Sequence, residues 1–125
     1  MKYCFGVDIG GTTVKIGLFT TEGELLDKWE IKTRTENKGE AILPDIAESL
    51  KEKMEEKQID REEMSGIGIG IPAPVSADGI VQNTANLGWG YKEVKRELEE
   101  LTDMRVAVGN DANVAALVEM WLGAG

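Results

Sequence analysis

Residues 3–18 read YCFGVDIGGTTVKIGL, and this stretch decides the fold. Its first part is a short apolar run that ends at Asp8, which is the pattern of a buried strand. In residues 13–18 every second residue is apolar, which is the period of a second strand. The glycines of residues 9–12 allow a tight turn between the two strands. The stretch therefore predicts a β-hairpin at the start of the chain.

A third strand is expected next, near residues 25–33, so that the first three strands form an antiparallel meander. The period then changes, because the following apolar residues recur every three or four positions, as on one face of a helix. Pro44 lacks a backbone N–H group and is tolerated only near a helix start, so we expect this helix to begin a few residues before it. Its apolar face consists of Leu43, Ile46, Ala47, Leu50 and Met54.

Strands and helices alternate in the second half of the chain. A fourth strand is expected at residues 66–72, with isoleucines on one face and glycines on the other, where something can approach the backbone closely. A small hairpin is expected around Asp78-Gly79, and a fifth strand at residues 106–108. A helix marked by Tyr91, Val94, Leu98 and Leu101 precedes that strand, and another follows it to about residue 122. A meander that feeds strand–helix–strand units predicts an α/β domain, with a mixed five-stranded sheet flanked by helices.

Composition limits the classes of function open to the chain. The net charge of −9 argues against a nucleic-acid binder, whose affinity comes largely from neutralising phosphates, but it leaves a nucleotide ligand open. The chain has one cysteine, Cys4, expected to be an inert core thiol, and no histidine, so its chemistry must rest on carboxylates, amides, hydroxyls, lysines and the backbone. No apolar run approaches the roughly 20 residues of a membrane span, and there is no signal-peptide pattern. We therefore expect a cytoplasmic protein that does not bind membranes.

The first candidate site is the segment from Asp8 to Thr13. Its two glycines leave backbone N–H groups free to face an anion, and the hydroxyl groups of Thr12 and Thr13 add donors. Asp8, at the end of the first strand, can hold a hydrated Mg²⁺ ion. The alternative is a plain Gly-Gly hairpin with an aspartate cap, and the segment alone leaves both interpretations open.

Two further polar segments are candidates. Asn110-Asp111 lies where the fifth strand meets the last helix, at the usual ligand edge of an α/β sheet, and a carboxylate there can accept a proton from a substrate hydroxyl. The alternative is a helix cap, for which Asp and Asn are preferred. Residues 83–89 read NTANLGW, and amides of this kind suit sugar hydroxyls. The alternative is a turn with a packed Trp89.

Together these segments resemble the ROK family, which groups sugar kinases with sugar-responsive repressors. Residues 8–12 resemble the family's phosphate-binding turn, residues 68–75 the segment that leads into the sugar site, residues 86–89 the sugar-contact loop of the glucokinase branch, and residues 110–117 the catalytic motif. The resemblance covers nearly the whole chain, although Ala73 stands where the family often has glycine. It implies the ribonuclease-H-like fold of the actin-like ATPases. The order of the predicted strands and helices leads to the same expectation.

The resemblance also implies an activity, the transfer of the γ-phosphoryl group of ATP to a hexose, with the 6-hydroxyl of glucose as the first expectation. Asp111 would be the general base, and Asp8 would organise Mg²⁺ through water. The phosphates would lie against Gly10, Gly11, Thr12 and Thr13. The sugar would lie against Ala73, Pro74, Asn86, Asn110 and Asp111.

Kinases of the family have a second lobe, with an adenosine-binding segment, further sugar contacts and a structural zinc site. We therefore expect residues 1–125 to be the N-terminal lobe of a two-lobed sugar kinase, inactive by itself, with zinc only in the other lobe. Residues 112–122 are apolar nearly all round the expected helix. Such a helix should pack against the second lobe or a partner subunit, so a homo-oligomer is expected.

The rival interpretation is the sugar-sensing domain of a repressor of the same family. Those repressors carry a DNA-binding helix-turn-helix before the core, whereas here the first strand is expected to begin at Met1 or Lys2. This start, the intact turn after Asp8 and the presence of Asp111 favour a kinase. A third interpretation is a folding unit that has neither activity.

Overall fold

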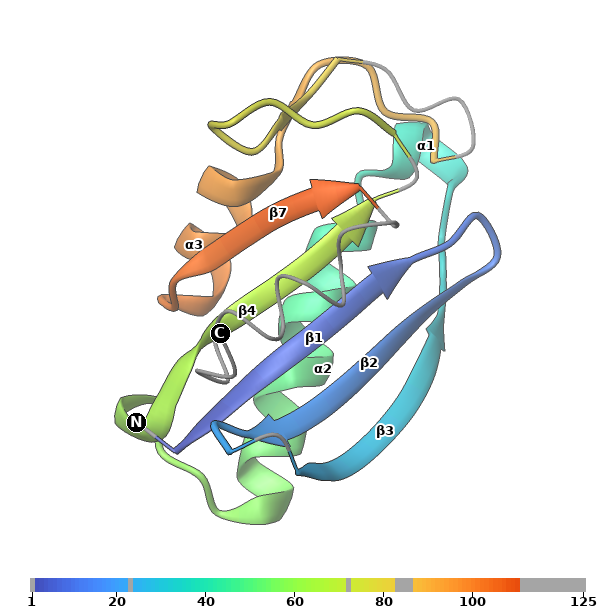
Figure 1. Ribbon diagram of the computed structural model, residues 1–125. Helices are drawn as coiled ribbons and strands as arrows, with labels where there is room; N and C mark the ends of the chain where they lie inside the picture. Colours follow the sequence, from blue (N-terminus) through green and yellow to red (C-terminus); the bar gives the residue numbers. More distant parts are fainter. Residues whose placement is uncertain (1, 23, 72, 83–86, 111–125) are drawn as a thin grey trace.

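The computed structural model describes residues 2–22, 24–71, 73–82 and 87–110, and for Asn110 the backbone only. Within them a five-stranded sheet has the strand order β3-β2-β1-β4-β7 (Figure 1). Its strands are β1 (Tyr3–Ile9), β2 (Thr13–Thr20), β3 (Leu25–Lys32), β4 (Met64–Ile71) and β7 (Val106–Asn110). The mixed five-stranded sheet that the sequence predicts is therefore confirmed.

Strand direction follows from how the strands are connected. Strands β1, β2 and β3 run antiparallel, because short turns join them into the predicted meander. Strand β4 pairs parallel with β1, and β7 pairs parallel with β4, so each of these connections needs a crossover. Helix α2 (Ile42–Lys57) supplies the first crossover and helix α3 (Val94–Thr102) the second.

Helix α2 covers one face of the sheet (Figure 1). The predicted start is confirmed, because the helix begins at Ile42 and Pro44 lies in its first turn, where a missing N–H group costs nothing. Its buried residues Ile42, Leu43, Ile46 and Leu50 belong to one cluster with the apolar residues of β1, β2 and β4. Burying a side chain of this size contributes roughly 1.5–3 kcal/mol, so this layer is the main source of stability.

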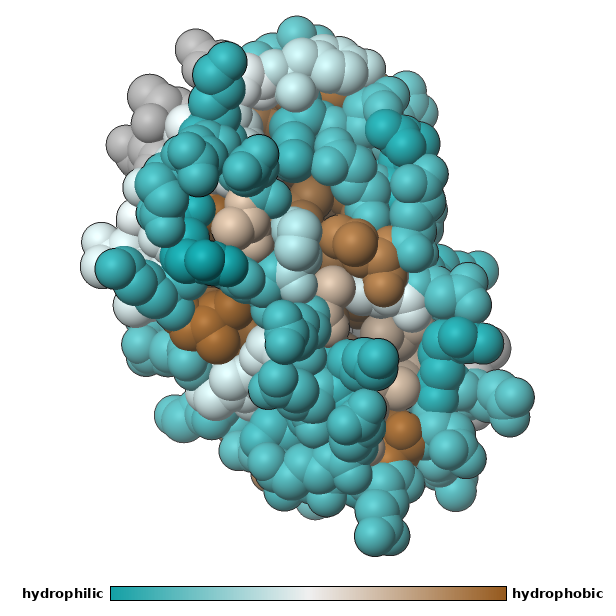
Figure 2. All heavy atoms as spheres, turned by 180° about the vertical axis from the view of Figure 1, so that it is seen from behind, coloured by the Kyte–Doolittle hydropathy of each residue, from teal (hydrophilic) through white to brown (hydrophobic). Residues whose placement is uncertain are grey.

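The face on the side of α2 is mostly hydrophilic, with a few apolar patches (Figure 2). A shallow pocket lies there between α2 and α3, and its lining includes Ala47, Met54, Leu101 and Met104. The charged run that begins at Lys51 lies largely on the exposed side of α2 and in the segment after it. None of the helices in the described part of the chain is long and apolar enough to cross a membrane.

Three short elements were not predicted. They are α1 (Glu36–Gly39), the 3₁₀ helix η1 (Arg61–Glu63) and β6 (Lys92–Glu93). The hairpin at Asp78-Gly79 is confirmed, because the N–H of Gly79 donates to the carbonyl of Ser76 at 3.0 Å and Val75 bridges to Val81 in β5 (Ile80–Val81).

The predicted start of the second helix is wrong. Tyr91 precedes the helix and is 61% exposed, because Lys92–Glu93 pairs with β5 and the helix begins only at Val94. Two boundaries also move, since β4 begins at Met64 and β7 continues to Asn110. The last predicted helix, residues 111–122, lies outside the described residues.

Candidate functional site

Three parallel strands end at the same edge of the sheet, and the candidate segments follow them there (Figure 1). The pairing register places Asp8 of β1 opposite Gly70 of β4, and Gly70 opposite Gly109 of β7. These three residues therefore form one row across the sheet, with about 4.8 Å between neighbouring strands. Since two members of the row are glycines, the Asp8 carboxylate has no side-chain neighbour on β4 or β7 in its own row. This edge is where ligands bind in open α/β sheets.

The turn between β1 and β2 exposes two backbone N–H groups at its tip. The N–H of Gly10 donates to the carbonyl of Thr13 at 2.9 Å, which closes the turn. Gly11 and Thr12 at its tip are exposed, and no group in the described residues accepts a hydrogen bond from either backbone N–H. A Cβ atom at Gly10 would lie 2.9 Å from the carbonyl oxygen of Thr13, so this close turn requires glycine. Two adjacent free N–H groups are suited to bind a phosphate.

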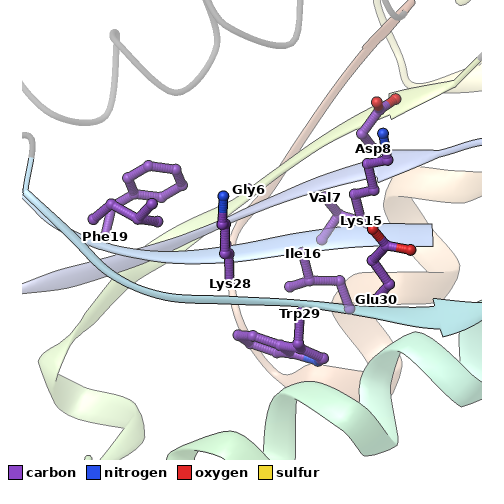
Figure 3. Close-up of a pocket in the computed structure, with 11 residues that line it drawn as sticks. Gly6, Val7, Asp8, Lys15, Ile16, Phe19, Lys28, Trp29 and Glu30 are labelled. Atoms are coloured by element: carbon purple, nitrogen blue, oxygen red, sulfur yellow. The ribbon is translucent and has the colours of Figure 1, made fainter.

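Asp8 is half-buried, and its strand neighbours carry charge. Lys15 of β2 lies opposite Asp8, and Glu30 of β3 lies opposite Lys15. The three side chains lie at one end of a pocket of about 550 Å³, with Phe19 toward the other end (Figure 3). The pocket lies over β1, β2 and β3, with Asp8, Lys15, Phe19 and Lys28 on the side away from α2 (Figure 3).

Asp8 fits the predicted magnesium role. The described residues contain no group of three or more His, Cys, Asp or Glu side chains that could hold a metal ion. Mg²⁺ keeps several waters and is commonly bound by one or two carboxylates together with substrate phosphates. One half-buried carboxylate two residues before the turn of Gly10 is compatible with that mode of binding, and the described residues alone offer no cage of three or more such ligands.

The predicted sugar-site residues after β4 lie at the same edge. Ala73 is half-buried, and its N–H donates to the carbonyl of Ile71, the last residue of β4, at 2.8 Å. Pro74 is exposed. The methyl group of Ala73 packs against the core, so the departure from the glycine common in the family is accommodated.

The aromatic residue of the predicted sugar loop is a structural anchor. Trp89 is 3% exposed, and its indole Nε1 donates to the carbonyl of Gly39 in α1 at 3.0 Å. Leu87 is fully buried beside it, and Lys92 Nζ lies 5.5 Å from the centre of the Trp89 ring. The interpretation of a packed Trp89 is therefore confirmed, while Asn86 lies outside the described residues.

The remaining predicted residues come from the end of β7. The backbone of Asn110 ends the strand opposite Ile71, at the same edge as Asp8 and Ala73. Asp111 lies outside the described residues, as does the side chain of Asn110. Their roles as base, sugar contact or helix cap stay predictions.

Two structural features of this edge were not predicted from the sequence. Asn37, Lys38 and Gly39 have φ values of 55°, 60° and 69°, a run of left-handed residues that supports Trp89. Asn and Gly two residues apart in a polar stretch are a signal for such a turn. Thr33, which follows β3, is buried against the turn of Gly10, and its sequence neighbourhood carries no signal for that contact.

Cys4 takes no part in this site. It is fully buried within β1, and burial raises the pKa of its thiol to about 11. The expected inert thiol is consistent with this, because a nucleophilic cysteine needs a lowered pKa and access to solvent.

Comparison with known proteins gives a consistent result. The sequence model of the ROK family matches residues 4–125. A glucokinase of Halalkalibacterium halodurans is 42% identical over 125 residues, and one of Thermotoga maritima is 38% identical over 122 residues. The match covers 99% and 96% of this chain respectively.

A structural comparison agrees with the sequence comparison. The crystal structure of a ROK family glucokinase from Streptomyces griseus, in complex with glucose and AMPPNP, matches 98% of this chain with a TM-score of 0.76 and 31% identity. This match establishes the actin-like ATPase fold. The chain spans only 37–38% of the length of these three proteins. Other relatives include an N-acetylgalactosamine kinase of Shewanella, 34% identical over 121 residues, and a putative xylose repressor of Caldicellulosiruptor, 30% identical over 119 residues.

Proposed function

Since the chain belongs to the ROK family, we propose that it is the first lobe of an ATP-dependent sugar kinase that converts glucose to glucose 6-phosphate. The observation that carries the proposal is the turn of Gly10 to Thr13. It offers free N–H groups at the sheet edge where Asp8, Ala73 and the end of β7 converge. A phosphate donor and a sugar can therefore meet over one edge of this lobe.

Each residue contributes to positioning in this mechanism. The N–H groups of Gly11 and Thr12 bind phosphate oxygens, and the hydroxyls of Thr12 and Thr13 add donors. Asp8 would hold Mg²⁺ through water, and the ion would supply charge neutralisation on the phosphates. Asp111 accepts the proton of the attacking sugar hydroxyl. Phosphoryl transfer requires mainly this alignment and charge stabilisation.

The sugar site combines residues from three segments in this proposal. Ala73 and Pro74 border it after β4, Asn110 at the end of β7, and Asn86 in the loop that Trp89 anchors. Amide groups recognise hydroxyls by donating and accepting at once. The relatives from Halalkalibacterium halodurans and Thermotoga maritima and the solved structure from Streptomyces griseus are named as glucokinases, which supports glucose as the substrate. The relative named for N-acetylgalactosamine makes amino sugars the alternative to test.

A second lobe completes the active site in this proposal. The chain spans 38% of the Halalkalibacterium glucokinase, so the adenosine site and the remaining sugar contacts belong to residues outside it. We expect residues 1–125 alone to show no turnover, and the complete kinase to act as a homo-oligomer in the cytoplasm.

The alternative function is that of a sugar-sensing repressor domain, which the relative named as a putative xylose repressor supports. The two functions differ in phosphoryl transfer, because a sensor binds sugar but does not need to release ADP. A coupled ADP-release assay on the full-length polypeptide, with glucose, N-acetylglucosamine, N-acetylgalactosamine and xylose, separates them. Sugar binding without ADP release for every sugar would favour the sensor.

The general base is tested in the same assay by Asp111→Asn. Asparagine keeps the shape and the capping ability of aspartate but cannot accept the proton, so kcat should fall by about 10²-fold or more while sugar affinity stays within a few-fold. Asp78→Asn is the matched control, because Asp78 is an exposed loop carboxylate of the hairpin before β5. Equal kcat values for the two variants would reduce Asp111 to a helix cap.

A further inference from the structure

Thr33 makes two hydrogen bonds to the turn between β1 and β2. It directly follows β3 and is 4% exposed. Among the described residues, Thr33 is the one polar side chain that is buried. Its Oγ1 donates to the carbonyl of Gly10 at 2.8 Å, and its backbone N–H donates to the carbonyl of Thr12 at 2.9 Å. Thr33, which lies 23 positions after Gly10 in the sequence, therefore binds the carbonyls of both residues that flank Gly11.

These two contacts set the direction of the N–H groups in the turn. In a planar trans peptide, the carbonyl of one residue and the N–H of the next point in opposite directions. Because Thr33 holds the carbonyl of Gly10, the N–H of Gly11 points away from Thr33, and the N–H of Thr13 does so for the same reason. Gly11 is exposed, and its N–H has no acceptor among the described residues.

The hydroxyl of Thr33 has a separate role from its backbone. A peptide between two glycines rotates easily, since neither residue has a Cβ atom to restrict it. If the Gly10–Gly11 peptide turned over, its carbonyl oxygen would face the ligand and repel an anion. The N–H of Thr33 donates to the Thr12 carbonyl, so among the described residues the donor to the Gly10 carbonyl is the Thr33 hydroxyl.

We propose that Thr33 is a positioning residue for phosphate binding: its hydroxyl holds the Gly10 carbonyl inward so that the Gly11 N–H faces a phosphate of the nucleotide. This rests on the proposed function, in which that turn binds ATP. Thr33 does not touch the nucleotide and acts through the Gly10–Gly11 peptide. Its removal therefore weakens nucleotide binding while sugar binding is unchanged.

The kinetic test uses the full-length polypeptide with Thr33→Val, which removes the hydroxyl but keeps the size, and Thr33→Ser, which keeps the hydroxyl. Thr33→Val should raise the KM for ATP by about five- to tenfold, the equivalent of one hydrogen bond, and leave the sugar Kd without nucleotide within about twofold. Thr33→Ser should restore the KM for ATP. Thr102→Val is the matched control, because Thr102 Oγ1 also donates to a carbonyl, that of Leu98, at 2.8 Å and in α3.

A purely structural role of Thr33 predicts a different result. Thr33→Val would then change the ATP and sugar constants equally, or Thr102→Val would raise the KM for ATP as much, and either outcome would overturn the proposal. Thermal unfolding of each variant is measured first. If Thr33→Val does not fold, Thr33→Ala removes the hydroxyl without placing an apolar methyl group against the carbonyl, and the same comparison is made with it.

A second readout separates this proposal from the proposed function. Selective ¹⁵N-glycine labelling of the full-length polypeptide follows the Gly11 amide during titration with inorganic pyrophosphate and with Mg-AMPPNP. The wild-type amide should shift on binding, and the shift should need at least about fivefold more ligand in Thr33→Val. If the wild type shows this shift but phosphorylates no sugar, the kinase proposal fails and the role of Thr33 stands. If the amide does not shift, the role of Thr33 is refuted.

Discussion

Replacing Gly39 by alanine tests how the loop of Trp89 is held. Gly39 ends α1 with a φ of +69°, a backbone conformation that favours glycine. A Cβ atom built there contacts the carbonyl oxygen of Leu87, and it lies 2.9 Å from Trp89 Nε1 and 3.0 Å from Ile42 Cδ1. All three neighbours belong to buried residues, so none of them can move aside freely.

The cost of this substitution follows from two contributions. A left-handed conformation costs a residue with a Cβ atom about 1–2 kcal/mol. The new methyl group displaces the Trp89 indole from the Gly39 carbonyl, and a buried donor without an acceptor costs about 1–3 kcal/mol. The expected loss in the free energy of unfolding is therefore about 2–5 kcal/mol.

Urea denaturation followed by circular dichroism measures this loss. Gly90→Ala is the matched control, because a Cβ atom at Gly90 meets nothing within 4 Å and should change stability by less than about 0.5 kcal/mol. Equal stability of the two variants would refute the reasoning. It would mean that the contact between α1 and Trp89 does not hold the loop.

Two further predictions concern titratable groups. The pKa of Asp27 is lowered, first by the hydrogen bond that Lys53 Nζ donates to its carboxylate at 2.7 Å. Ionised Asp27 therefore stabilises the folded state above its unfolded pKa of about 3.9. This stabilisation is lost as the pH falls through the lower pKa of the folded state. Lys53→Met should therefore lower stability in urea at about pH 6 more than at about pH 2, and an equal loss at both would contradict this origin. Burial raises the pKa of Cys4 to about 11, so at about pH 8 a thiol reagent should label Cys4 at least about 100-fold more slowly in the folded chain than in urea. Similar labelling rates in the two states would show that Cys4 is accessible.

The sequence alone determined the elements whose signals are local. Alternation from Val14 to Leu18 and the apolar run before Asp8 predicted the first hairpin, and the spacing of apolar residues with Pro44 predicted where α2 begins. These predictions hold because a residue's own neighbours decide which side of a strand or helix is buried. Asp8 and Asn110 were each predicted near the end of a strand, and both lie at one edge of the sheet because the parallel strands β1, β4 and β7 end together.

Only the tertiary structure decided how distant segments support the site. Tyr91 was predicted to lie in a helix, but the next residues, Lys92–Glu93, pair with β5. Pairing with another strand outweighs a weak helical pattern. The row of Asp8, Gly70 and Gly109 depends on the register between strands, which no single strand encodes. Thr33 reaches Gly10 across 23 positions and Trp89 reaches Gly39 across 50. Hydrogen bonds between such distant residues depend on how the layers pack, and a local sequence pattern carries no information about that packing.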